Sequence, residues 1–331
     1  MFNTIHTNQQ LFTLASLILT VIIVLWLLQY GIIHYGKQIF VQGKHYCEVL
    51  KQYFGVSKRL VRLKNSYPKL YQFLWQRLRI QRFYGLPLTL LFLVMGYIIS
   101  LFIGLVEDVV TSDSIVAMDH FVSQQMGLLS DSAVVNFFIF MTSLGSTPIT
   151  CLVVLLTGIL CWVIGQRYIV IGLLTATIGS TVFTFLSKLL FHRGRPLDIL
   201  LLEQTYSFPS GHATVTIALY GFIAYMAIRF SRNFTRQVRI VVFTIFFSIL
   251  IGLSRIVLNE HYLSDVLGGY LVGALWLTVA ISMTEWLSAR GKINWQIRWS
   301  SSQIYLVWLG VVSVLIGTLI YAVYYQFPLL L

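Results

Sequence analysis

The sequence predicts an all-α protein, a polytopic membrane helical bundle with about eight spans. The first observation is composition, because 57% of the residues are hydrophobic and only 10% are charged. Soluble domains carry about 25% charged residues, so a chain with so few could not cover a surface exposed to water. The second observation is that the apolar residues gather in runs of about 20, the length that crosses the hydrocarbon core of a bilayer. Lipid is therefore the expected solvent.

The apolar runs predict the spans in chain order, at residues 11–35, 86–105, 148–165, 168–191, 212–230, 238–258, 263–287 and 304–327. The first run is expected to be a retained transmembrane helix. The residues before it carry no Lys or Arg, whereas a signal peptide begins with a basic segment. The third run is the least distinct. Residues 133–144 are also apolar, but Gly145 and Pro148 interrupt the pattern, so an interfacial helix is expected there.

A long basic segment, residues 36–84, follows the first run. It holds eleven Lys or Arg against one acid, Glu48, and apolar side chains are interleaved with the charges. This composition favours amphipathic helices that lie on the cytoplasmic face against anionic lipid. The alternative is a solvated loop without a specific partner.

The distribution of Lys and Arg predicts the orientation of the chain. If residues 36–84 are cytoplasmic, alternation of the spans places 19 of the 23 Lys and Arg residues inside. Cytoplasmic loops are enriched in these residues, so both termini are expected outside.

The basic residues left on the outer side form one cluster, made of Lys188, Arg193, Arg195 and Arg255. They belong to segments 188–196 and 254–265, and a third segment, 207–212, opens a span at the same face. A cation near the bilayer centre costs about 2.5–3.5 kcal/mol on insertion scales, so it usually marks a site. The three segments are therefore expected to converge. We interpret His192 as a satisfied polar group near a helix end and Arg193 as an interfacial anchor, or both as rim residues that help to attract anions.

The cluster has the chemistry of a phosphate site. Lys188, Arg195 and Arg255 supply three cations, and guanidinium groups match phosphate oxygens. Ser210 and Gly211 precede a predicted helix, whose first backbone N–H groups attract anions.

Two histidines accompany the cations. His212 lies on the first turn of the predicted helix, and His261 precedes Asp265 by four residues. If the stretch from His261 to Asp265 is helical, both side chains share one face. A carboxylate there can hold one ring nitrogen protonated and leave the other as a nucleophile.

These segments resemble the three signature motifs of the type 2 phosphatidic acid phosphatase superfamily. The first motif is Lys, six residues and Arg-Pro, matched from Lys188 to Pro196. The second is Pro-Ser-Gly-His, matched by residues 209–212. The third is Ser-Arg, five residues, His, three residues and Asp, matched from Ser254 to Asp265.

The resemblance implies a division of the chain and a role for each matched residue. Residues 85–287 would form a six-helix phosphatase core, between the N-terminal transmembrane helix (1–35) with the basic segment (36–84) and a cytoplasmic loop with the C-terminal transmembrane helix (288–331). His261 would attack phosphorus, Asp265 would orient it, and His212 would protonate the departing lipid oxygen. The phosphoryl group would be held by Lys188, Arg195, Ser210, Gly211 and Arg255.

The implied activity is hydrolysis of lipid phosphates or pyrophosphates, of the undecaprenyl pyrophosphate, phosphatidylglycerol phosphate or phosphatidate type, through a phosphohistidine. No metal and no organic cofactor are implied, and the partners are the lipid substrate and membrane lipids, not nucleic acid. The protein is expected in a bacterial inner or plasma membrane, and the charge distribution predicts that its active site faces outward. The mainly apolar linker 197–208 predicts that a substrate tail enters from the outer leaflet.

Two other functions remain open. A lipid phosphotransferase would use the same phosphohistidine and every motif residue. A non-catalytic lipid-binding or transport protein would be expected to lack His212 or His261, and both are present. Vanadium haloperoxidases share the motifs, but they are soluble.

Overall fold

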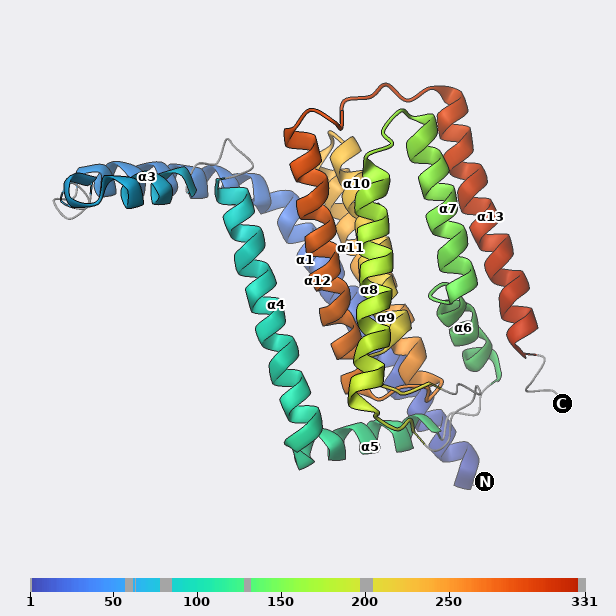
Figure 1. Cartoon of the computed structure of the whole chain (residues 1–331). Coiled ribbons are helices and arrows are strands. Elements are labelled where there is room, and N and C mark those ends of the chain that lie inside the picture. Colours follow the sequence, from blue (N-terminus) through green and yellow to red (C-terminus); the bar gives the residue numbers. More distant parts are fainter. Residues whose placement is uncertain are drawn as a thin grey trace.

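The structure, a computed structural model, describes residues 2–56, 62, 64–77, 85–127, 132–196 and 205–326. Within these ranges all the regular elements are helices, which confirms the all-α prediction (Figure 1). Seven helices are long and apolar enough to cross a membrane, and a sharply bent pair of helices makes an eighth if it counts as one span. The described residues thus hold seven to eight candidate spans, in agreement with the predicted number of about eight, and the chain is an integral membrane protein.

The helices of the described residues are, in chain order, α1 (Phe2–Val56), α3 (Pro68–Arg77), α4 (Leu86–Thr111), α5 (Asp113–Gly127), α6 (Ser132–Ser143), α7 (Thr147–Val163), α8 (Ile169–Phe191), α9 (Gly211–Val215), the π-helical turn η1 (Thr216–Tyr220), α10 (Gly221–Phe230), α11 (Phe234–Val257), α12 (Leu263–Ala289) and α13 (Ser301–Gln326). The elements α9, η1 and α10 follow one another without a break and form one span, Gly211–Phe230.

Helix α1 runs without interruption from the first span into the basic segment. Its apolar part covers Leu11–Gly36, and the helix continues to Val56. Beyond the bundle it extends beside α3, away from the other helices (Figure 1). Residues 57–61, 63 and 78–84 of the basic segment lie outside the described residues, and contact with a lipid surface remains a prediction.

Helices α6 and α7 meet end to end at a bend of 46°. Helix α6 is the segment expected to be interfacial, and α7, with 17 residues, reaches spanning length only together with α6. The break at Gly145 also serves packing, because a Cβ atom there would lie 3.0 Å from Cδ2 of His212. The turn between α6 and α7 therefore fits closely against a predicted site residue.

Helix α5 lies across one end of the bundle (Figure 1). No apolar run predicted it, because its sequence mixes charged, polar and apolar residues and is short of spanning length. It contacts both α11 and α12, so it covers the turn that joins them.

Helix α12 occupies the centre of the bundle and packs against α4, α8 and α9. Its approach to α9 depends on Gly269, where a Cβ atom would lie only 2.5 Å from the carbonyl oxygen of Ser210. Only glycine allows the two backbones to come so close. The start of α12 and the start of α9 are thereby held side by side.

The helix ends lie at the two ends of the bundle as the charge pattern predicts. The C-terminal ends of α8 and α11 and the start of α12 lie at the same end of the bundle as the N-terminus and the end of α13 (Figure 1). Helix α3 and the basic part of α1 lie at the opposite end. The structure thus supports the predicted alternation of the spans, and which end faces outward remains a prediction.

Candidate active site

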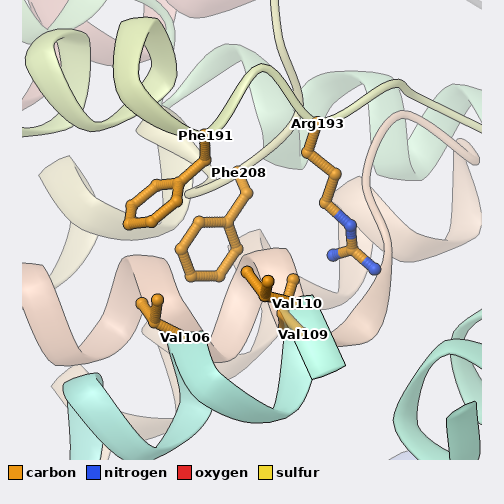
Figure 2. A pocket seen from close by; sticks show the side chains of 6 residues that line it. All are labelled: Val106, Val109, Val110, Phe191, Arg193 and Phe208. Carbon is orange, nitrogen blue, oxygen red and sulfur yellow. The ribbon is translucent and has the colours of Figure 1, made fainter. Parts of the chain in front are cut away.

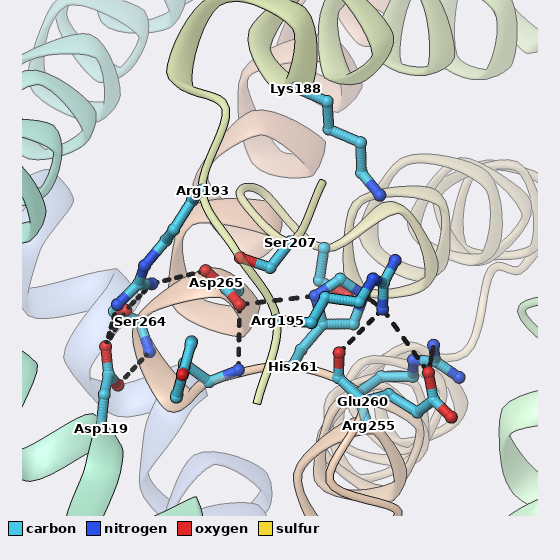
Figure 3. A network of polar contacts seen from close by, with 12 residues as sticks. Asp119, Lys188, Arg193, Arg195, Ser207, Arg255, Glu260, His261, Ser264 and Asp265 are labelled. Atoms are coloured by element: carbon cyan, nitrogen blue, oxygen red, sulfur yellow. Dashed lines mark hydrogen bonds and ion pairs between the residues drawn. The ribbon is translucent and has the colours of Figure 1, made fainter. Parts of the chain in front are cut away.

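The structure brings together predicted site residues at one end of the bundle, among them Lys188, Arg195, Arg255, His261 and Asp265 (Figure 3). Lys188 lies in the last turn of α8, and Arg195 follows in the loop after that helix. Ser210 is the N-cap residue of α9, and its backbone N–H donates to the carbonyl oxygen of Asp265 at 2.9 Å. Residues far apart in the sequence thus meet, as the shared face of the spans predicts.

His261 and Asp265 form the centre of the site. Nδ1 of His261 lies 3.5 Å from Oδ2 of Asp265, and both side chains are almost fully buried. His261 precedes α12, whereas Asp265 lies in its first turn and accepts a hydrogen bond of 2.9 Å from the backbone of Tyr262. The two side chains meet across a helix start, not along the face of a continuous helix.

Arg195 lies at the edge of the His261 ring opposite Asp265. Its Nη1 lies 3.4 Å from Nε2 of His261, and it donates to the carbonyl oxygen of Glu260 at 2.8 Å. A guanidinium group only donates, and a carboxylate only accepts. Arg195 beside Nε2 and Asp265 beside Nδ1 therefore favour the tautomer with its proton on Nδ1 and a lone pair on Nε2.

The other cations lie around this pair. Lys188 donates to the hydroxyl of Thr205 at 3.1 Å, and Arg195 donates to the same hydroxyl at 3.0 Å. Arg255 is 1% exposed, and its Nη1 donates to the hydroxyl of Thr142 at 2.6 Å. The shared contact with Thr205 brings Lys188 and Arg195 close enough to bind one anion.

Glu260 is a site residue that the sequence analysis missed. It is fully buried, and its Oε2 lies 3.5 Å from Nη1 of Arg195 and 3.6 Å from Nη2 of Arg255. One carboxylate thus holds two guanidinium groups in place. The available sequence signal was an acid directly before the histidine of the third motif.

The rim interpretation of Arg193 is wrong. Its Nη1 bonds to Oδ1 of Asp265 at 2.6 Å and its Nη2 to Oδ2 of Asp119 at 2.7 Å. Burial lowers the pKa of Arg193, but the two carboxylates outweigh this effect and raise the pKa above its ordinary value. Arg193 points inward because two buried carboxylates require a counter-charge. Its partner Asp119, on α5, belongs to no motif and had no local signal.

His192 lies beside this inward arginine. Its ring packs against Tyr206 with the ring centroids 4.5 Å apart, and its backbone, with φ of 48°, ends α8. The pair of aromatic rings is a sufficient structural reason for this histidine.

The start of α9 offers polar atoms to a ligand. Ser210 is the N-cap residue, yet its side chain makes no capping hydrogen bond. The hydroxyls of Ser210 and Thr184 are both buried and have no hydrogen-bond partner in the described part of the chain. Buried polar atoms are usually paired, so two unpaired hydroxyls beside a helix N-terminus indicate space for an anion. His212 follows at the second position of α9.

An apolar cavity of about 200 Å³ adjoins the site (Figure 2). It lies between the end of α4 and the loop that follows α8, and its lining residues are Val106, Val109, Val110, Phe191, Arg193 and Phe208. Of these, Arg193 also belongs to the polar network. The wall of the cavity formed by α4 therefore consists of valine side chains.

The charges of the site suit an anion. The cations Lys188, Arg193, Arg195 and Arg255 accompany three carboxylates, those of Asp119, Glu260 and Asp265. Among the described residues, no group of three or more His, Cys, Asp or Glu side chains has the arrangement of a metal site. An anion at the site would thus meet arginine and lysine side chains.

The fold and the site together define a class of protein: an α-helical membrane protein with a buried histidine–carboxylate pair and a cluster of arginine and lysine side chains at one end of its bundle. Residues 167–289 match the PAP2 superfamily. The match includes all three motifs, from Lys188 to Asp265, and agrees with the resemblance that they predict.

Two relatives illustrate the match. The chain is 37% identical over 79 residues to phosphatidylglycerophosphatase B of Bacillus subtilis (strain 168), a stretch that spans 23% of this chain and 38% of the relative. The crystal structure of a transmembrane PAP2-type phosphatidylglycerolphosphate phosphatase from Bacillus subtilis is 21% identical, with a TM-score of 0.54. That likeness covers 58% of this chain and 96% of the other, and at this identity it demonstrates a shared fold.

Proposed function

We propose that the protein is an integral membrane lipid phosphatase that hydrolyses lipid phosphates or pyrophosphates through a phosphohistidine intermediate. The observation that carries this proposal is the environment of His261. Asp265 lies at Nδ1 and Arg195 at Nε2, so the ring presents a lone pair beside a cation that can bind phosphate. Activation of a nucleophile by an oriented neighbouring group is the general pattern of covalent catalysis.

The reaction proceeds in two steps. Nε2 of His261 attacks phosphorus and forms an N–P bond, while the bond from phosphorus to the lipid oxygen breaks and His212 gives that oxygen a proton. Water then attacks the phosphohistidine, His212 takes a proton from the water, and inorganic phosphate leaves His261. The two histidines start in opposite protonation states, as paired acid–base groups require.

The arginine and lysine side chains stabilise the phosphoryl group during transfer. Arg195 extends toward it from the loop after α8, and Lys188 extends toward it from the last turn of α8. Glu260 and Thr142 hold Arg255 in position. Groups that are fixed before the reaction need not reorganise as charge develops, which is a large source of rate acceleration. The unpaired hydroxyl of Ser210 and the backbone of Gly211 complete the binding site.

The orientation and the substrate class follow from the membrane environment. We place this end of the bundle outside, in a bacterial inner or plasma membrane, because the opposite end carries the basic segment. Lys188 is followed by two outward-facing leucines, Leu189 and Leu190, which are 47% and 73% exposed. A lipid phosphate could therefore reach Lys188 while its tail stays in the outer leaflet. Of the apolar linker 197–208, which is expected to line the path of the tail, residues 197–204 lie outside the described residues.

Activity should increase with the length of the lipid tail. Purified protein in detergent is offered phosphatidylglycerol phosphate, phosphatidate, undecaprenyl pyrophosphate and a short, soluble analogue of each head group, and released phosphate is measured. Each buried methylene contributes about 0.8 kcal/mol, so kcat/KM should rise by about fourfold for each one that is held. Equal kcat/KM for a lipid and its soluble analogue would contradict the proposal that the lipid tail stays in the outer leaflet and contributes to binding.

The same assay separates hydrolysis from transfer. With ³²P-labelled substrate and an added acceptor lipid, a phosphatase releases labelled inorganic phosphate, whereas a phosphotransferase labels the acceptor. The His261→Ala variant serves as the control for contaminating phosphatases. Absence of release and of transfer with all the substrates would leave the non-catalytic function.

Turnover should not require a metal. The positive charges come from arginine and lysine side chains, which the structure holds within reach of one another. Phosphate release should therefore persist in excess EDTA and should not increase when magnesium or zinc is added. Loss of activity with the chelator and recovery with either metal would refute this mechanism.

A further inference from the structure

Helix α5 supports the turn that carries His261. Asp119, in the middle of α5, is 2% exposed, although it belongs to none of the motifs. We propose that Asp119 is a positioning residue, which acts through Arg193 and Ser264 to hold Asp265 and His261 in their reactive arrangement. This inference rests on the proposed function, because it deepens the role of the same site.

The first link is the bridge made by Arg193. Its guanidinium group binds Asp119 through Nη2 at 2.7 Å and Asp265 through Nη1 at 2.6 Å. It also lies over the ring of Tyr262, with its carbon 4.6 Å from the ring centroid. Because Arg193 occupies Oδ1 of Asp265, the other oxygen, Oδ2, remains for His261 and for the backbone of Tyr262. The bridge thus determines which carboxylate oxygen faces the nucleophile.

The second link is a direct bond from Asp119 to the start of α12. Its Oδ1 accepts the backbone N–H of Ser264 at 3.0 Å, and its Oδ2 accepts the Ser264 hydroxyl. The first N–H groups of a helix have no partner within the helix, so an acceptor from another element stabilises them. Asp119 therefore holds the helix turn on which Asp265 lies.

The third link is on the other side of His261. Ser123, one turn after Asp119 on α5, donates to the side chain of Asn259 at 2.8 Å. Asn259 has φ of 55°, the left-handed conformation that turns the chain after α11. Between these contacts, the ring of His120 packs edge-on against Tyr262 at 5.4 Å. One face of α5 thus holds the turn both before and after His261.

Loss of this support should affect the reaction more than phosphate binding. Of the phosphate-binding side chains, Arg195 is held by Glu260 and Thr205, and Arg255 is held by Glu260 and Thr142. Asp265, by contrast, is linked to Asp119 through Arg193. A misplacement of about 1 Å at a reacting group can cost about 10²-fold in rate.

The test compares Asp119→Asn with Asp113→Asn, which changes an exposed acid at the start of the same helix. Asparagine keeps the shape of Asp119 and can still accept from Ser264, so the variant is expected to fold. The rate of phosphohistidine formation and kcat should fall by about 10-fold to 100-fold, with KM changed by less than about threefold. Asp113→Asn should match the wild type.

A second measurement does not depend on turnover. Nitrogen-15 NMR of histidine-labelled protein reports which ring nitrogen carries the proton, and the His261→Ala spectrum identifies the signal. The wild type should show His261 protonated on Nδ1, and Asp119→Asn should show a mixture of tautomers. If the wild type releases no phosphate while the tautomer shifts in the variant, the proposed function fails and the positioning role stands.

Three outcomes would overturn the positioning role. They are an unchanged His261 signal in Asp119→Asn, an unchanged kcat in the folded variant of an active enzyme, and a loss confined to KM. The cycle of Asp119→Asn, Arg193→Lys and the double variant adds a further check, because residues that act through one bridge have non-additive effects. Additive losses would mean that Asp119 does not act through Arg193.

Discussion

Replacement of His261 by Ala is expected to abolish phosphohistidine formation and to lower turnover by about 10⁴-fold or more. The variant lacks the nitrogen that attacks phosphorus, and Arg195 beside it cannot replace it, because a guanidinium group only donates hydrogen bonds. Labelled protein is quenched in base, where phosphohistidine is stable, and its bound phosphate is counted. Substrate should still bind, since the phosphate-binding cations remain.

The control for this experiment is His34→Ala. His34 is exposed on α1 and bonds to the carbonyl oxygen of Tyr30 within its own helix. It should retain both turnover and labelling. Normal labelling of the His261→Ala variant would show that another residue is the nucleophile, and the first candidate would then be His212.

Replacement of His212 by Ala is expected to lower kcat by about 10²-fold to 10⁴-fold, the usual contribution of a general acid. His212 lies on the first turn of α9, and its ring packs against Gly145 at the break between α6 and α7. It is thus held by a different element from His261. Without it, the lipid oxygen must depart without a proton.

A substrate with a better leaving group distinguishes the two histidines. A lipid analogue with a phenolic oxygen in place of the alcohol needs little protonation, so it should partly restore phosphohistidine formation in His212→Ala. The same analogue should not restore it in His261→Ala. Equal restoration in both variants, or in neither, would contradict the assigned roles.

Much of the fold could be predicted from local composition. A bilayer excludes unpaired backbone groups, so each long apolar run must form a helix, and the runs mark the spans directly. The bend between α6 and α7 was signalled by Gly145 and Pro148. Helices were predicted in residues 36–84, but the unbroken continuation of α1 into that segment and the presence of α5 were not, because neither segment has a uniform apolar pattern.

The motif residues could be predicted because basic side chains are rare on the predicted outer side of this protein. With Arg193, the residues Lys188, Arg195 and Arg255 are the cations of a side that otherwise lacks them. The spacing of His261 and Asp265 indicates their partnership. The sequence alone therefore determined the class of protein and a number of spans that agrees with the seven to eight candidate spans of the described residues, and it predicted the reactive residues.

Only the tertiary structure decided how those residues are held. Arg193 was interpreted as a rim residue and proved to be the bridge between Asp119 and Asp265, while Glu260 proved to hold two arginines. A buried ion pair leaves no periodic pattern in the sequence, since its members, such as Asp119 and Arg193, lie far apart along the chain. Their partnership arises from the path of α5 across the end of the bundle, and that path depends on how all the helices pack.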